Sequence, residues 1–186
     1  MCANVDLTAF LPTVKHSGAS FTIGIVYLIT RAANAIPEFR QRIRKDQVVE
    51  HEVVHPSATI LVDDDLFSFC AFEYREHFRL FAADAQERIE AVRKDPWIAD
   101  DSDQDWQLFM SAIPWVSFTS FMHPLNFPVD SIPRFAWGKY FREGDRVKMP
   151  LNVQGHHALM DGLHMGRYYQ RLQEDLDRAG SILEVG

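Results

Sequence analysis

Three segments with helical periodicity, separated by short runs typical of strands, constrain most strongly what this chain can fold into. Residues 75–94 carry the clearest pattern, because apolar residues recur every three or four positions and fall on one stripe of a helix. They are Phe78, Phe81, Ala82, Ala85, Ile89 and Val92. A second helix is predicted over 20–44, with a break and a new turn at Pro37. The third covers 161–179, with Asp161 placed to begin it and Gly180 to end it.

Runs rich in β-branched and aromatic residues lie between these helices and predict strands. The expected strands are residues 59–62, 67–72, 106–112, 116–121, 135–141 and 145–154. Turns are expected at His55-Pro56 and at Gly144-Asp145. Helices and strands mix without strict alternation, and the last strands follow one another closely. We therefore predict an α+β fold, a two-layer sandwich with a mixed, largely antiparallel sheet.

Length and charge narrow the class of protein. A chain of 186 residues fits one domain, residues 1–186, with a core of its own. The formal net charge is −7 and no block of Lys or Arg stands out, which argues against nucleic acid as a partner. An acidic protein can still bind an anionic ligand through a few well-placed cations.

Cysteine usage and the N-terminal residues bear on the compartment. Cys2 and Cys70 have no metal-binding or redox spacing, which suits a reducing cytosol. The N-terminus lacks the basic start and apolar run of a signal peptide, and the longest apolar stretch, residues 21–29, is too short to span a bilayer. We expect a cytoplasmic protein that does not enter a membrane.

Residues 154–162 carry the strongest chemical signal. Two adjacent histidines, His156 and His157, follow an apolar strand, and Asp161-Gly162 begins the last helix shortly afterwards. A loop between a strand and a helix often carries a reactive group. Imidazole accepts a proton near neutral pH, so one of the two rings is a natural general base for a hydroxyl or thiol.

Other interpretations of the histidine pair stay open at the level of the pattern. The two rings could be solvated or structural, or could belong to a metal site. Adjacent residues of a strand point to different faces, and no Cys or further His stands at ligand spacing, so we predict no metal site. Asp161 could orient the loop, pair with a cation or cap the helix.

Residues 156–162 read HHxxxDG, which resembles the active-site motif of the trimeric chloramphenicol acetyltransferases. The same motif class occurs in dihydrolipoamide acyltransferases and in the condensation domains of peptide synthetases, whose domains are far longer than this chain. Other segments resemble the acetyltransferases in the same order. They are Asn34–Arg40, Pro114–Phe121 with the sequence PWVSFTSF, Gly138-Lys139-Tyr140 and Gly144-Asp145. Several matching segments in order are more specific than the motif alone.

The resemblance implies roles for individual residues. The second histidine of the pair is the base, which corresponds to His157, whereas His156 packs or forms hydrogen bonds. The second serine of PWVSFTSF, Ser120, would stabilise the tetrahedral oxyanion. Asp161 would be structural, held by an ion pair. Lys139 and Tyr140 are expected near the CoA tunnel, although a solvated lysine and an ordinary sheet tyrosine remain an equal alternative.

The resemblance also implies the reaction and its partners. Acetyl-CoA would be the co-substrate, chloramphenicol the default acceptor, and a homotrimer the assembly, with each active site between two subunits. Two alternatives stay open. One is a protein of the same fold that binds CoA or a small molecule with little turnover, and the other is an acetyltransferase for a different hydroxyl acceptor, motivated by Arg134.

The chain departs from the family pattern at several places. It is expected to lack the family's N-terminal strand and helix, and with them the arginine that pairs with the aspartate at position 161. Ala136 stands where the family often has a threonine that helps to hold a water near the oxyanion. Arg134 stands where the family has an apolar pocket wall, and Ser20 stands where family members have a lysine near CoA.

Overall fold

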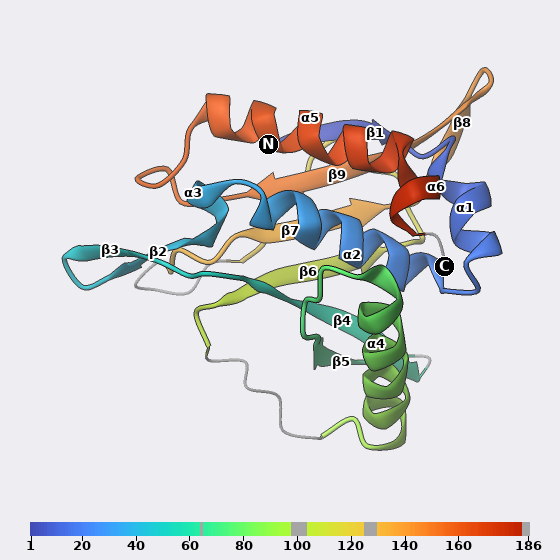
Figure 1. Ribbon diagram of the computed structural model, residues 1–186, viewed down its shortest axis with the longest axis horizontal. Coiled ribbons are helices and arrows are strands. Elements are labelled where there is room, and N and C mark those ends of the chain that lie inside the picture. Colours follow the sequence, from blue (N-terminus) through green and yellow to red (C-terminus); the bar gives the residue numbers. More distant parts are fainter. Residues whose placement is uncertain (64, 98–103, 125–129, 184–186) are drawn as a thin grey trace.

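The computed structural model describes residues 1–63, 65–97, 104–124 and 130–183. A seven-stranded sheet contains β1 (Cys2–Asp6), β4 (His55–Asp63), β5 (Leu66–Ala71), β6 (Gln107–Ile113), β7 (Arg134–Gly138), β8 (Phe141–Glu143) and β9 (Arg146–Gln154). The strand order is β1-β9-β7-β6-β4-β5, and β8 pairs with β9. A separate hairpin, β2 (Gln41–Arg44) and β3 (Gln47–Glu50), extends away from this sheet (Figure 1).

The directions of the strands confirm the predicted mixed sheet. In the described part of the chain, β4, β6 and β7 run parallel to one another. The pairs β1–β9, β4–β5, β7–β9 and β8–β9 are antiparallel. The predicted turn at Gly144-Asp145 joins β8 to β9, and Gly144 has a φ of 59°, which glycine adopts without strain.

The helices cover one face of this sheet (Figure 1). The longer ones are α2 (Phe21–Asn34), α4 (Phe78–Lys94) and α5 (Gly162–Asp177). The shorter ones are α1 (Phe10–His16), α3 (Pro37–Arg40) and α6 (Ala179–Ile182). The predicted break before Pro37 and the predicted cap at Asp161 are both present. The two-layer α+β sandwich is therefore confirmed.

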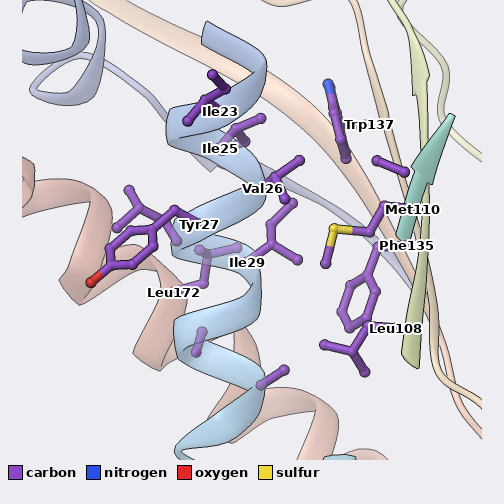
Figure 2. Close-up of a cluster of buried hydrophobic side chains, with 14 of the residues drawn as sticks. Ile23, Ile25, Val26, Tyr27, Ile29, Leu108, Met110, Phe135, Trp137 and Leu172 are labelled. Atoms are coloured by element: carbon purple, nitrogen blue, oxygen red, sulfur yellow. The ribbon is translucent and has the colours of Figure 1, made fainter. Parts of the chain in front are cut away.

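Helix α2 forms the centre of the core. Every residue from Ile23 to Thr30 is buried, as expected for a helix that is apolar on all sides. Figure 2 shows Val26 and Ile29 facing Met110 and Phe135 of the sheet, whereas Tyr27 lies on the other side of the helix. Helices α4 and α5 both pack against α2, so the second layer is built around this one helix.

Several local predictions are wrong. Residues 41–44, expected at the end of a helix, form the strand β2. Gly180, expected to end the last helix, lies inside α6, since α5 already ends at Asp177. Residues 116–121 were predicted as a strand, but they form no ladder and are joined to β7 by a hydrogen bond from Lys139 N–H to the Val116 carbonyl. His55-Pro56 begins β4 rather than forming a turn, and Pro56 is tolerated because it is the second residue of the strand. The strand β1 was not predicted, because only its pairing with β9 makes these five residues a strand.

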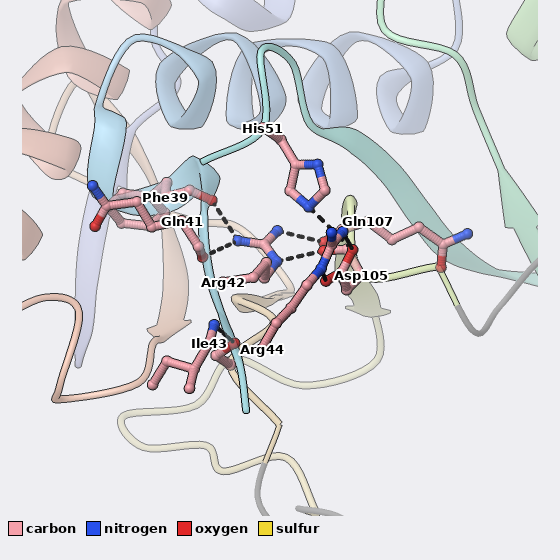
Figure 3. Close-up of polar contacts among 9 residues, drawn as sticks. Phe39, Gln41, Arg42, Ile43, Arg44, His51, Asp105 and Gln107 are labelled. Atoms are coloured by element: carbon pink, nitrogen blue, oxygen red, sulfur yellow. Dashed lines mark hydrogen bonds and ion pairs between the residues drawn. The ribbon is translucent and has the colours of Figure 1, made fainter. Parts of the chain in front are cut away.

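Arg42 fixes the β2–β3 hairpin to the start of β6 (Figure 3). The side chain is fully buried, and burial lowers its pKa to about 10. The guanidinium donates to the backbone carbonyls of Phe39, Gln41, Asp105 and Gln107. The hairpin therefore depends on one cation that satisfies four carbonyl groups from two distant segments.

Replacing Arg42 with Met should lower the free energy of unfolding by about 3 kcal/mol, because buried carbonyl groups lose their donor. Urea unfolding followed by circular dichroism measures this loss. Arg44→Met is the matched control, since Arg44 pairs with Asp105 at 2.7 Å from an exposed position and should matter far less. Equal losses in the two variants would contradict the role given to Arg42.

Candidate active site

The loop between β9 and α5 holds the predicted base. Met160 is buried, and its side chain lies against Gly155, where an added Cβ atom would overlap the Met160 Sδ atom. A side chain at position 155 would therefore require Met160 to move. Leu159 is also buried, whereas His157 is exposed. The loop is thus anchored by two inward side chains and presents His157 outward.

Hydrogen bonds distinguish the two histidines. The Nδ1 atom of His157 lies 3.2 Å from the Met160 carbonyl oxygen, which can only accept. His157 therefore carries its proton on Nδ1, and its Nε2 lone pair is available as a base. In His156, Nδ1 accepts the N–H of Ala158 at 3.2 Å, so the neutral ring carries its proton on Nε2. The local geometry favours His157 as the proton acceptor.

Asp161 caps α5. Its Oδ1 atom accepts the N–H groups of Leu163 at 2.9 Å and His164 at 3.4 Å, and the Asp161 N–H donates to His164 Nδ1 in return. The hydrogen bond from Leu163 N–H is the largest cause that lowers the pKa of the Asp161 carboxyl group. His164 Nε2 also lies 3.4 Å from Glu38 Oε1. Asp161 is therefore held by a capping box with His164, which Glu38 supports, rather than by an arginine.

A cavity of about 520 Å³ lies at the carboxyl ends of the parallel strands β4 and β6. This volume falls within the range of small-molecule sites, about 300–1,000 Å³. The lining comes from α2, β4, β5, α4, β6 and the segment after β6. The lining residues are Ser20, Thr22, Thr59, Ile60, Leu61, Phe67, Gln86, Ile89, Arg93, Ser111, Ala112, Ile113, Pro114, Trp115 and Phe121.

The predicted oxyanion residue does not line this cavity. Ser120 is exposed in the irregular segment after β6, although its neighbour Phe121 is a lining residue. Ser111, near the end of β6, does line it. Ser111 also lies opposite Ala136 on β7, the position that the resemblance links to the oxyanion. The signal for Ser111 in the sequence was a hydroxyl near the carboxyl end of a predicted strand.

Lys139 and Tyr140 follow β7 at the same end of the sheet as the cavity, but neither lines it. Both are exposed, and the Tyr140 ring lies 5.9 Å from Phe21 at the start of α2. Ser20, which caps α2, is a lining residue. The two predicted CoA-binding residues therefore stand near the rim.

Arg134 forms part of a local ion pair. Its side chain is 8% exposed and binds both carboxylate oxygens of Asp130, at 2.9 and 2.5 Å. It also lies over the Phe109 ring. Because Asp130 neutralises this charge, Arg134 does not create an anion-binding wall.

Within one chain, His157 and the cavity lie at opposite ends of the sheet. Gln154, the last residue of β9, pairs with Arg134, the first residue of β7. The cavity lies beyond Ser111, further toward the carboxyl ends of β6 and β7. Since β9 runs antiparallel to β7, residues 155–157 continue away from the cavity. One chain therefore does not bring the base and Ser111 together.

The described residues offer neither a metal-binding cluster nor a membrane-spanning helix. No group of three or more His, Cys, Asp or Glu residues in these ranges could hold a metal ion. No helix in the same ranges combines the length and apolar character needed to cross a membrane.

Comparison with known proteins identifies the family. The family model described as chloramphenicol acetyltransferase matches residues 1–173. The chain belongs to the chloramphenicol acetyltransferase family. It is 36% identical to a chloramphenicol acetyltransferase of Escherichia coli over 93% of this chain and 80% of that protein. A chloramphenicol acetyltransferase of a Klebsiella species is 37% identical, with the same coverage.

A solved structure of a chloramphenicol acetyltransferase superimposes with a TM-score of 0.86 at 28% identity, covering 95% of this chain and 86% of that one. Family membership makes this chain an acyltransferase. The roles of His157, Ser120, Asp161, Lys139 and Tyr140 stay predictions, as does the expected lack of the acetyltransferases' N-terminal strand and helix.

Replacing Asp161 with Ala should lower the melting temperature, because α5 loses its cap, whereas Asn should retain most of the cap. The carboxyl pKa is lowered in the folded chain, so its contribution is present above the unfolded pKa and disappears as pH falls through the folded pKa. The stability gap between wild type and Asp161→Asn should therefore close in acid. An unchanged melting temperature with a large loss of activity would instead indicate a direct chemical role.

Proposed function

We propose that this chain transfers the acetyl group of acetyl-CoA to a hydroxyl of chloramphenicol, with His157 Nε2 as the general base. The observation that carries this proposal is the contact of His157 Nδ1 with the Met160 carbonyl, which leaves the Nε2 lone pair for the acceptor. Kinship with the chloramphenicol acetyltransferases supports the two substrates.

The proposed reaction needs no acyl-enzyme. The acceptor hydroxyl gives its proton to His157 Nε2 while its oxygen forms a bond to the thioester carbon. The tetrahedral oxyanion then collapses, the carbon–sulfur bond breaks, and the imidazolium returns the proton to the CoA sulfur. The products are the acetyl ester and free CoA. Direct attack requires both substrates to be held together beside the base.

A hydroxyl donor would stabilise the oxyanion. Ser111 and Ser120 are the two candidates, and the lining of the cavity favours Ser111. Ser111 and Ala136 face away from the helices, because their neighbours Met110 and Phe135 belong to the core. A donor fixed on a strand needs no reorganisation when the charge develops, which is the condition for an effective oxyanion site.

Each active site then requires two chains. The opposite placement of His157 and Ser111 within one chain supports a site shared between subunits, and we propose a homotrimer on the pattern of the resemblance. The base comes from one subunit, and the cavity comes from its neighbour. A C3 ring repeats one heterologous contact three times and so completes three identical sites.

The compartment and the acceptor complete the proposal. We place the reaction in the cytoplasm, because the spacing of Cys2 and Cys70 in the sequence suits a reducing compartment. Chloramphenicol is the proposed acceptor. If the protein does not acetylate chloramphenicol, two alternatives gain support: a different hydroxyl acceptor, or a protein that binds its ligands with little turnover. The ion pair of Arg134 with Asp130 gives no support to an anionic acceptor.

Replacing His157 with Ala should lower turnover by about 10²–10⁴, the usual loss of a general base, with CoA affinity unchanged. Release of free CoA thiol from acetyl-CoA in the presence of chloramphenicol measures turnover. His156→Ala is the matched control and should retain most of the activity, because its Nε2 carries the proton. Similar losses in the two variants would remove the basis for choosing His157, and an inactive wild type would reject chloramphenicol as the acceptor.

Replacing Ser111 with Ala should lower kcat by about 10²–10³ with little change in KM, because an oxyanion donor acts mainly in the transition state. Ser120→Ala is the competing variant. A loss confined to Ser120→Ala would return the role to that residue.

Mixed trimers of two inactive variants test whether one active site uses residues of two chains. Unfolding and refolding His157→Ala together with Ser111→Ala should restore part of the activity, since some mixed sites receive both wild-type residues. Refolding each variant alone is the control. No recovery in a mixture that forms trimers would contradict a site shared between two chains.

A further inference from the structure

We infer that Arg93 binds a phosphate group of CoA at the mouth of the cavity and thereby selects the complete CoA thioester over shorter acyl donors. This inference rests on the proposed function, because it assigns the cavity to the acyl donor. Neither the sequence pattern nor the family resemblance pointed to this residue.

Arg93 is the one charged residue among the described residues that line the cavity. It lies in the last turn of α4, and its side chain is exposed, whereas Ile60 and Ile89 of the same lining are 5% and 6% exposed. The buried aliphatic residues mark the inner wall, and Arg93 marks the edge where the cavity meets solvent. The cavity therefore has an apolar interior and a cationic mouth.

The guanidinium of Arg93 has no partner among the described residues. No ion pair or hydrogen bond joins it to another residue in those ranges. Arg88 on the same helix differs, because its Nε atom lies 2.8 Å from Asp84. An exposed arginine without a carboxylate partner retains its five donors for a ligand.

The two ends of acetyl-CoA match the apolar interior and the cationic mouth of the cavity. Its thioester end is an uncharged pantetheine arm, and its other end carries a pyrophosphate and a 3′-phosphate. The arm can enter an apolar cavity while the phosphates remain at the solvent edge. A guanidinium binds phosphate through two parallel hydrogen bonds, which gives orientation as well as attraction. In a chain with a net charge of −7, a local cation also offsets the repulsion of an anionic ligand.

The proposed acceptor, chloramphenicol, gives no role to the charge of Arg93. Chloramphenicol carries no ionised group at neutral pH, so it has no charge for Arg93 to bind. An acceptor with an anionic group would use Arg93 differently, and the affinity for CoA itself separates the two cases.

The test measures the Kd of CoA by calorimetry for the wild-type protein and for two variants of adjacent residues. Arg93→Gln should raise the Kd about tenfold, the loss of one charge-assisted contact. Lys94→Gln removes the same charge from the next residue, which does not line the cavity, and should leave the Kd unchanged. Melting temperatures of the variants check that both remain folded.

A second measurement uses donors of different length. The KM of acetyl-CoA should rise in Arg93→Gln, whereas the KM of S-acetylpantetheine, which lacks all these phosphates, should not change. Acetyl-3′-dephospho-CoA identifies the phosphate that is bound. If Arg93→Gln leaves the KM of acetyl-3′-dephospho-CoA unchanged, Arg93 binds the 3′-phosphate. If the substitution still raises this KM, Arg93 binds the pyrophosphate.

Several results would overturn the inference. A Kd for CoA in Arg93→Gln equal to that of the wild type would do so, as would an equal loss in Lys94→Gln or no CoA binding by the wild type. If the wild-type protein binds CoA but does not acetylate chloramphenicol, the proposed function fails while the Kd comparison still decides the role of Arg93.

Discussion

The antiparallel pairing of β9 with β7 is the constraint on which the arrangement of the candidate active site depends. It carries the chain that follows β9 toward the amino end of β7, whereas the parallel strands β4 and β6 deliver their last residues to the other end. His157 and the cavity are therefore separated by the sheet itself. The proposed catalysis by His157 at this cavity would therefore need a second chain.

Helix α2 joins this sheet to the rest of the core. Helix α2 is buried along most of its length, with the sheet on one side and α4 and α5 packed against it. A helix buried in this way must fit its neighbours closely, since interiors are packed to nearly crystalline density. Ser20, which caps the same helix, lines the cavity, so the core and the cavity share one element.

The sequence predicted most of the helices and strands, and the differences between prediction and structure have physical causes. Val116 and Phe118 alternate as in a strand, but this segment crosses close to Gly138 instead of forming a ladder; a Cβ there would lie 2.8 Å from the Val116 carbonyl. Ser120 was assigned from a motif, whereas Ser111 reaches the cavity because of its register on β6. Register arises from pairing between distant segments, which a local pattern does not contain.

The sequence by itself determined the stripes of the helices, the histidine pair with its glycine and aspartate, and the family resemblance, because each depends on residues close together in the chain. The tertiary structure decided which ring presents a free Nε2, which serine lines the cavity and which cation stands at its mouth. Arg93 lines the same cavity as Ser20 and Trp115 only because α4 packs beside the sheet. Such encounters depend on the angle at which helices and strands cross, and that angle is set by the whole core at once.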